Sequence, residues 1–490
     1  MPDAQTHDHA PDKARDARPV LAVDLDGTLI RSDMLHETFW AAIAADPRAL
    51  QESIAALGRG GKAGLKGYLA ARDEVDVTTL PYDEEVLDRI RAWRAEGGRT
   101  ALVTATDARL AGAIAAHLGV FDEVHGTTPD RNLKGTAKAA FLAERFGAQG
   151  YVYIGDSSAD LPVWAGAVEA ISTGAAGSVR RRLDAGTVPA EHLHTDAARH
   201  RPQAVLRALR PHQWLKNLLV LVPLIASQSF GISDLAGVLA AFVALSLVAS
   251  GGYVLNDLLD LGDDRAHPRK RNRPFASGAL SAGIGTLTVP VLILAGFAIA
   301  WLQSVPLLGS VALYLVATTA YSVKLKRHTM VDICMLAFLF TLRIIAGGLA
   351  IGVTLSVWLL AFSMFIFFAL AAVKRLAELT DIEAAARTTS RRGYRPEDRG
   401  VISQMAVTSG YIAVLVYALY INEPVVQANF SSPWLLWGVC PFLIFWISRL
   451  VLVATRGEMY DDPMVWSLTN RTSQKALGLS LVLVAGAVLI

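Results

Sequence analysis

The chain changes character near Asn217, where a mixed and charged sequence gives way to long apolar stretches separated by charged loops. A bilayer core about 30 Å thick needs roughly 20 apolar residues per helix, and several stretches approach or reach that length. Residues 1–210 instead mix Arg, Asp, Glu and Ala, as soluble domains do. The sequence therefore predicts a soluble N-terminal part followed by an all-α bundle of membrane helices.

We expect nine membrane spans in the second part. The run from Pro274 to Val323 has no charged residue and is too long for one helix, so we divide it at 303–306. The nine expected spans are 215–232, 235–255, 283–302, 306–323, 331–351, 355–373, 402–422, 432–450 and 474–490.

The loops between these spans alternate in charge. Those after the second, fourth, sixth and eighth spans are basic, whereas the other four contain no Lys or Arg. Basic loops face the cytoplasm. Residues 1–18 are polar, do not resemble a signal peptide and are expected to form a disordered tail. We therefore expect a multi-pass protein of the inner (cytoplasmic) membrane, with its soluble part in the cytoplasm and its C-terminus outside.

Charge and cysteine content narrow the function classes. The 46 Lys and Arg residues nearly balance the 44 Asp and Glu residues, so the sequence does not suggest a nucleic-acid partner. The only two cysteines, Cys334 and Cys440, lie in apolar stretches, so neither a disulfide framework nor a zinc site is expected.

Four motifs in the soluble part carry reactive groups: DLDGTLI, RTALVTATD, NLKGTAK and YVYIGDSSAD. In all but NLKGTAK these groups lie where a strand is expected to end. Phosphoryl transfer needs a carboxylate nucleophile, a second carboxyl group to protonate the leaving oxygen, and a cation that neutralises the phosphate. The motifs therefore predict a phosphoryl-transfer site. In chain order its groups are Asp24, Asp26, Thr104, Lys134, Asp156 and Asp160.

This motif order resembles the haloacid dehalogenase superfamily of phosphatases over about residues 19–190. The resemblance implies an α/β Rossmann-like domain with a small helical cap at about 31–95. It also implies that Asp24 is the nucleophile and Asp26 the general acid and base. The alternative is a non-catalytic regulatory or binding module, against which the intact set of motifs argues.

The same resemblance implies further ligand roles. Thr104 and Lys134 would hold phosphate oxygens, with Lys138 as a weaker candidate for the role of Lys134. Asp24, Asp156 and the carbonyl of Asp26 would bind Mg²⁺, and Asp160 would support that metal site.

The second expected span ends in an acidic segment, YVLNDLLDLGDDRAHPRKRNRP. On one continuous helix its three spaced aspartates would share a face and converge at the cytoplasmic mouth of the bundle. These like charges would repel unless Mg²⁺ binds, and the ion can clamp a diphosphate leaving group. Basic residues that follow, including Lys270 and Arg271, would also bind anions. The polar residues of the segment are Asn256, Asp257, Asp260 and Asp264.

The pattern NDxxDxxxD resembles the UbiA-type prenyltransferase superfamily, intramembrane enzymes with nine helices, over roughly residues 205–490. Typical members carry a second aspartate-rich motif after the sixth span, where this chain has KRLAELTDIEAAARTTSRRGYRPED. This segment supplies Lys374, Arg375, Glu378 and Asp381 in place of an aspartate cluster. Upstream, RPHQWLKN and AYSVKLKRH supply Lys216, Tyr321, Lys324 and Lys326.

The motifs RPHQWLKN, NDLLDLGDDRAHPRKRNRP and KRLAEL resemble the decaprenyl-phosphate phosphoribosyltransferase branch of that superfamily. The resemblance implies Mg²⁺-dependent transfer of phosphoribose from phosphoribosyl diphosphate to a polyprenyl phosphate. The lysines, Asn256, Tyr321 and Glu378 would bind substrate, and the aspartates, Asp381 included, would bind metal. Arg343 lies deep in an expected span, where we favour a substrate-phosphate role over a structural pair with a carboxylate.

These expectations combine into a bifunctional enzyme for envelope glycan synthesis, in which the soluble domain dephosphorylates the product of the membrane domain at residues 211–490. A linker at residues 191–210 would keep the two sites at high effective concentration. The alternative is an aromatic prenyltransferase that uses a prenyl diphosphate and carries a phosphatase domain of unrelated role. The sequence leaves the polyprenyl length, the natural phosphatase substrate and a homo-oligomer open.

Overall fold

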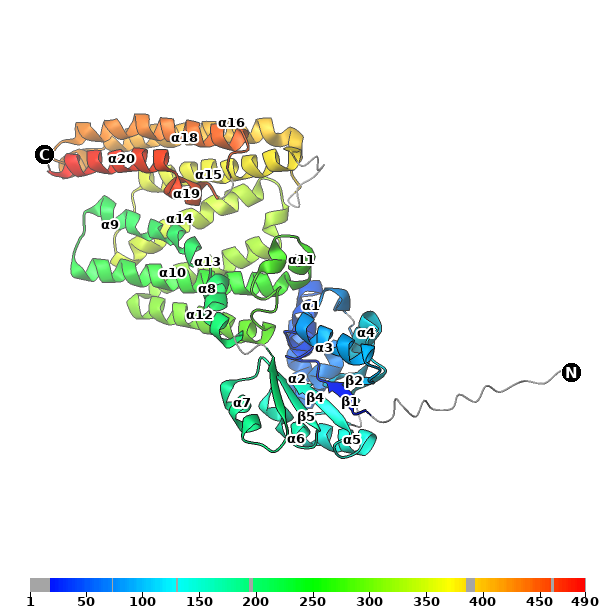
Figure 1. The fold of residues 1–490 in the computed structure, drawn as a ribbon. Coiled ribbons are helices and arrows are strands. Elements are labelled where there is room, and N and C mark those ends of the chain that lie inside the picture. Colours follow the sequence, from blue (N-terminus) through cyan, green and yellow to red (C-terminus); the bar gives the residue numbers. More distant parts are fainter. Residues whose placement is uncertain are drawn as a thin grey trace. The chain divides into compact units, whose positions relative to one another are not determined.

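The computed structural model describes residues 18–72, 74–128, 131–193, 197–384, 393–459 and 462–489. The expected disordered tail therefore lies outside the described residues, apart from Arg18. The chain forms two compact units (Figure 1). The first comprises Met1–Leu209 and Tyr253–Val289, and the second comprises Arg210–Gly252 and Pro290–Ile490.

A six-stranded parallel sheet forms the centre of the first unit, with the strand order β3-β2-β1-β4-β5-β6 (Figure 1). The central strands are wholly buried because helices cover both faces, as is usual for parallel sheets. Val23 at the end of β1 lies opposite Leu102 and Ile154. The strands are β1 (Val20–Val23), β2 (Thr100–Asp107), β3 (Glu123–Thr127), β4 (Tyr151–Gly155), β5 (Glu169–Thr173) and β6 (Ala190–Leu193).

Three helices lie between β1 and β2 in the chain, within the expected cap. Of these, α3 packs Val86, Leu87 and Ile90 into the core on one face of the sheet. The pair α1 and α2 has a small core of its own around Ala42 and Leu69, so this pair forms the cap proper. The helices of this domain are α1 (Met34–Ala45), α2 (Ala49–Ala70), α3 (Glu84–Ala95), α4 (Ala108–Leu118), α5 (Thr136–Phe146), α6 (Leu161–Trp164) and α7 (Gly177–Asp184).

The first unit also contains two parts that follow the expected phosphatase domain. The segment at 191–210, which we expected to be a plain linker, contains most of β6 and then α8 (Ala197–Leu209). The segment Tyr253–Val289 contains the end of α10 (Ile232–Leu259), α11 (Leu261–Ala266) and the start of α12 (Ala282–Gln303). The acidic segment therefore belongs to the same compact unit as the parallel sheet.

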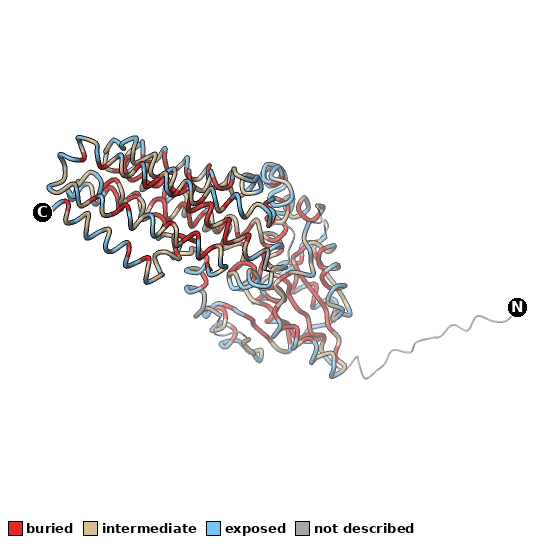
Figure 2. Tube along the Cα trace, turned by 90° about the horizontal axis from the view of Figure 1, so that it is seen from above, coloured by how far each residue is buried: buried red, intermediate tan, exposed pale blue. Residues whose placement is uncertain are grey.

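Eight helices of the described residues are long and apolar enough to cross a membrane. Figure 2 shows buried and exposed positions alternating along these helices. Exposed positions are often large and apolar, such as Leu294, Val316 and Leu415, as expected for surfaces that face lipid. Besides α10 and α12, the helices that contain these spans are α13 (Val305–Val323), α14 (Val331–Ile351), α15 (Val357–Ala384), α16 (Arg399–Ile421), α18 (Val439–Thr455) and α20 (Arg471–Leu489).

The expectation of nine spans is not confirmed. Residues expected to form the first span instead form a 3₁₀ helix, Pro211–Leu221, and the six-residue helix α9, Val222–Ser227. Gln228 then ends α9 in the left-handed conformation, which breaks helical continuity. Eight spans of the described residues do not support the expected position of the C-terminus outside, and the membrane orientation is a prediction from the basic loops.

Candidate active sites

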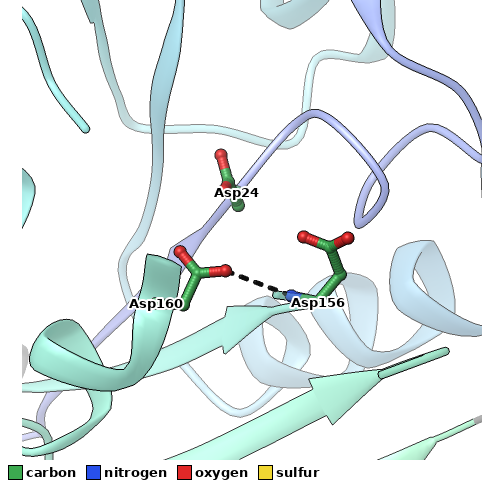
Figure 3. Close-up of side chains that lie close together, drawn as sticks. All are labelled: Asp24, Asp156 and Asp160. Atoms are coloured by element: carbon green, nitrogen blue, oxygen red, sulfur yellow. Dashed lines mark hydrogen bonds between the residues drawn. The ribbon is translucent and has the colours of Figure 1, made fainter. Parts of the chain in front are cut away.

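Three carboxylates gather at the carboxyl edge of the parallel sheet (Figure 3). Asp24 follows β1 and Asp156 follows β4, and these two strands are neighbours in the sheet. One oxygen from each of Asp24, Asp156 and Asp160 lies within 4.8 Å of the others. Gly27 allows Asp156 to lie against the turn that follows β1, because a Cβ at position 27 would lie 2.4 Å from Asp156 Oδ2. The positive φ of Gly27 (73°) also favours glycine in the turn.

Lys138, rather than Lys134, contacts Asp24. The buried Lys138 Nζ lies 2.7 Å from Asp24 Oδ2 and 3.7 Å from Asp160 Oδ1, and it donates to the Tyr153 hydroxyl at 2.8 Å. Burial would lower the pKa of Lys138, but the carboxylates of Asp24 and Asp160 outweigh that effect and raise it. Lys134 is exposed and lines the surrounding cavity. The weaker of the two sequence candidates is therefore the cation on the predicted nucleophile.

Asp26 is held by two hydrogen bonds. The backbone N–H of Met34 donates to Oδ1 at 2.7 Å, and the Thr106 hydroxyl donates to Oδ2 at 2.8 Å. Burial and the charge of Asp33 raise the pKa of Asp26 to about 7. The carboxyl group is therefore substantially protonated at neutral pH, as a general acid must be.

The sequence missed Thr106, whose hydroxyl reaches Asp26. Thr104, the predicted phosphate ligand, is wholly buried, and its hydroxyl accepts a hydrogen bond from the Thr106 backbone N–H at 3.1 Å. Successive side chains alternate between the faces of a strand, so residues two apart point to the same side. The second threonine of TATD was the available signal for another hydroxyl near the end of β2.

The acidic cluster fits a Mg²⁺ ion. Burial and the charges of Asp24 and Asp160 raise the pKa of Asp156 to about 8, which shows how unfavourable this concentration of negative charge is without a cation. Asp160 Oδ2 accepts hydrogen bonds from the backbone of Asp156 and Ser157 at 3.3 and 3.1 Å, and Oδ1 accepts one from Tyr153. Asp160 is thus already occupied by protein donors, so Asp24 and Asp156 would be the direct ligands.

A cavity of about 1650 Å³ opens over this cluster within the first unit. Its lining combines the acidic residues with five cations, which would attract a phosphate group. One of them, Lys66 of α2, donates to the Ala105 carbonyl at 3.1 Å and so extends from the cap to the end of β2. The five cations are Arg31, Lys66, Lys134, Lys138 and Arg207.

The acidic segment after α10 forms two pairings rather than one cluster. Asp257 and Asp264 are both buried and share Arg273, whose Nη1 lies 3.1 and 2.6 Å from their oxygens. Asn256 donates instead to Asp260 at 2.8 Å. Among the described residues, these three aspartates do not form a group whose oxygens all lie within 4.8 Å of one another.

The reason is a break in the helix. The prediction of a shared face assumed one continuous helix, whereas α10 ends at Leu259 and α11 begins after Asp260. Asp264 Oδ1 is buried, accepts no hydrogen bond from the described residues and lies 3.6 Å from Lys270 Nζ. An unsatisfied carboxylate oxygen of this kind fits a metal ligand. Arg271 is exposed.

In the second unit, Asp462 links two predicted substrate-binding lysines. Lys216 Nζ and Lys374 Nζ each lie 2.9 Å from Asp462 Oδ2. Burial would raise the pKa of Asp462, but the two ammonium groups hold it well below its usual value. Among the described residues, two ammonium groups thus share one carboxylate. Asp462 was not predicted from the sequence; its local feature is its place as N-cap of α19 (Pro463–Thr469).

Arg343 makes hydrogen bonds to neutral groups. Its guanidinium donates to Asn217 Oδ1 at 2.8 Å, to the Tyr314 hydroxyl at 2.9 Å and to the Leu339 carbonyl. The carboxylate pair that we weighed for Arg343 is therefore not seen among the described residues. The arrangement ties the 3₁₀ helix at 211–221 to α13 and α14.

A second buried network surrounds Arg375. Its Nε lies 2.5 Å from the fully buried Asp332, and Tyr394 donates to the same carboxylate. Arg375 also pairs with Glu378 and donates to Tyr321 at 3.4 Å. Glu378 and Tyr321 are therefore brought together by Arg375. The other predicted residues of this region lie at the ends of their helices, Lys324 and Asp381 exposed and Lys326 partly buried.

Comparisons with known proteins cover both halves. The UbiA prenyltransferase family matches residues 217–465, and the haloacid dehalogenase-like hydrolases match residues 21–164. The uncharacterized protein y4nM of Sinorhizobium fredii is 36% identical over 463 residues, which cover 94% of this chain and 89% of that protein.

Two other relatives each match more than half of this chain. The nodulation protein NoeC of Azorhizobium caulinodans is 37% identical over 56% of this chain and 91% of its own length. The decaprenyl-phosphate phosphoribosyltransferase of Mycobacterium tuberculosis is 33% identical over 58% of this chain and 93% of its own length. The chain belongs to the UbiA prenyltransferase family and carries an N-terminal haloacid dehalogenase-like hydrolase domain.

Proposed function

We propose that this protein is a bifunctional membrane enzyme that makes a lipid-linked phosphoribose. The membrane half would transfer 5-phosphoribose from phosphoribosyl diphosphate to a polyprenyl phosphate, and the phosphatase half would remove the 5-phosphate. The observation that carries the proposal is the pair Lys216 and Lys374 on Asp462. Lys374 lies in the segment where typical family members have their second aspartate-rich motif, and Lys216 binds the same carboxylate, which favours an anionic group over a second metal ion.

The transfer step needs no proton. An oxygen of the polyprenyl phosphate attacks C1 of the ribose, the bond between C1 and the diphosphate oxygen breaks, and diphosphate leaves. A Mg²⁺ ion at Asp257 and Asp264 would neutralise that leaving group. In the second unit, Lys216 and Lys374 would bind phosphate oxygens of a substrate.

The hydrolytic step uses two carboxyl groups. Asp24 attacks the phosphorus atom of the 5-phosphate to form an aspartyl phosphate, and Asp26 gives its proton to the departing ribose oxygen. Asp26 then takes a proton from water, which attacks the aspartyl phosphate and releases inorganic phosphate. A Mg²⁺ ion held by Asp24 and Asp156 would neutralise phosphate charge. Lys138 offsets the charge of Asp24, so that the nucleophile can approach an anionic phosphate.

The proposal is tested with purified full-length protein in lipid vesicles. We expect diphosphate release that requires both phosphoribosyl diphosphate and polyprenyl phosphate, followed by release of inorganic phosphate. Diphosphate release that instead requires a prenyl diphosphate and an aromatic acid would support the aromatic prenyltransferase alternative and refute the proposed transfer.

Two lysine variants separate the candidates for the phosphatase cation. Lys138→Ala should lower hydrolysis of ribose 5-phosphate at least about 100-fold, because Asp24 loses the charge that offsets its own. Lys134→Ala should cost less than about 10-fold, mainly in KM, because an exposed side chain at the cavity wall contributes to binding. Steady-state kinetics check this, with circular dichroism as the folding control. A larger loss of activity in Lys134→Ala than in Lys138→Ala would instead make Lys134 the principal cation.

A further inference from the structure

A turn from the UbiA-matching part of the chain packs directly against the phosphatase domain. Gly278 has a positive φ (73°), and a Cβ there would lie 2.6 Å from the Cβ of Arg31 and 3.1 Å from that of Pro81. A Cβ at Gly283 would lie 3.0 Å from the His36 ring. Gly278 and Gly283 thus leave room for the phosphatase domain, because a side chain at either position would collide with it.

A buried ion pair joins the same two surfaces. Arg265 donates from Nη1 and Nη2 to both oxygens of Glu37 at 3.0 and 2.8 Å, and from Nε to the Ala276 carbonyl at 3.1 Å. The side chains are only 7% and 3% exposed, respectively. A buried charge is unfavourable without its partner, so this contact depends on both residues. Arg265 therefore links helix α1 of the cap to the turn that contains Gly278.

Apolar packing extends the contact. Trp40 of α1 is buried among Leu258, Leu261 and Phe275, and its indole N–H donates to Thr286 at 2.8 Å. The surface therefore combines an apolar core, a two-pronged ion pair and a directional hydrogen bond. These features are typical of a specific and lasting interface.

The docked turn also forms part of the phosphatase cavity. Gly278, Ala279 and Ser281 line the same cavity as Asp24 and Asp156. At about 1650 Å³ the cavity exceeds the roughly 300–1,000 Å³ of an ordinary small-molecule site. The turn leads directly into α12, one of the helices apolar enough to cross a membrane.

We propose that the segment Pro274–Thr286 is a wall of the phosphatase site that selects a phosphate monoester carried on a membrane lipid. The inference rests on the proposed phosphatase activity and adds the segment that recognises its lipid-borne substrate. Because the wall belongs to the start of a membrane helix, a lipid-borne ester can reach the cavity along it. A free sugar phosphate has no lipid portion, so the wall should not increase its rate of hydrolysis.

The test compares two esters with full-length protein in vesicles: free ribose 5-phosphate, and separately prepared polyprenyl-phosphoribose 5-phosphate in the bilayer. Glu37→Arg and Arg265→Glu should each lower hydrolysis of the lipid ester about 10-fold or more and change that of the free ester less than about twofold. The double reversal should restore most of the loss, because the pair is rebuilt with opposite polarity. Glu96→Arg, which removes an exposed ion pair with Arg18, is the matched control.

Gly278→Ala provides a second variant that changes no charge and should show the same selective loss. The proposed role of the segment Pro274–Thr286 would be contradicted by equal losses on both esters, by unchanged hydrolysis of the lipid ester, or by a double reversal that restores no activity. Wild-type protein that hydrolyses the free ester without preferring the lipid ester would refute the wall and leave the phosphatase activity standing. Hydrolysis of neither ester would refute the proposed phosphatase itself.

Discussion

Asp24→Asn is expected to abolish the release of inorganic phosphate from ribose 5-phosphate while diphosphate release by the same preparation continues. An amide is not a nucleophile toward phosphorus, so hydrolysis should fall at least about 10³-fold. Asn keeps the size of Asp and still leaves Asp160 as a partner for Lys138, so the fold should persist. Malachite-green phosphate detection and a coupled diphosphate assay measure the two activities separately.

The matched control is Asp88→Asn, which removes an exposed carboxylate from α3 and its ion pair with Arg91. It should change hydrolysis less than about twofold, as is usual for surface ion pairs. Hydrolysis that survives Asp24→Asn would contradict the assigned nucleophile. A wild-type protein that hydrolyses no phosphate ester would instead support the regulatory-module alternative for this domain.

The sequence predicted the geometry of the phosphatase half well, because residues that follow parallel strands lie at the same edge of the sheet. The apolar run at Val20–Val23 forms β1 as expected, and β4 begins at Tyr151 beside it. Motifs that follow such neighbouring strands must meet at one edge of the sheet. The pairing of Asp24 with Asp156 was expected from the resemblance to the haloacid dehalogenase motifs, and the neighbouring strands β1 and β4 supply its physical reason.

The choice between Lys134 and Lys138 could not be made from the sequence. Both follow β3 within one motif, and the chain there turns into α5, which begins at Thr136. Only the packing of α5 on the sheet shows that Lys138, in the first turn of the helix, is buried and contacts Asp24. Side-chain burial on a helix depends on its tertiary neighbours, which a four-residue spacing does not specify.

Two features of the membrane half escaped prediction for physical reasons. Helix periodicity predicted a shared face for Asp257 and Asp264, and they do meet, but through Arg273 after a break at Asp260. Asp462 escaped notice because its partner Lys216 lies 246 residues away in the chain. Long-range ion pairs leave no local pattern, whereas helix caps and strands do.

Asp257→Asn is the variant expected to have the largest effect on the membrane half. It should lower diphosphate release from phosphoribosyl diphosphate by about 10²–10³-fold, because the leaving group would lose a metal ligand. The remaining activity should need a higher Mg²⁺ concentration, whereas phosphatase activity on ribose 5-phosphate should not change. Titrating Mg²⁺ in the diphosphate assay measures both effects.

The nearby Asp263→Asn offers a matched control, since Asp263 is exposed one position before the buried Asp264. It should leave both the rate and the Mg²⁺ dependence within about twofold of wild type. A purely structural role for Asp257 as the partner of Arg273 predicts a different result. Thermal stability would then fall with activity while the Mg²⁺ concentration for half-maximal rate stayed the same. An unchanged Mg²⁺ requirement in Asp257→Asn would therefore remove this carboxylate from the proposed metal site.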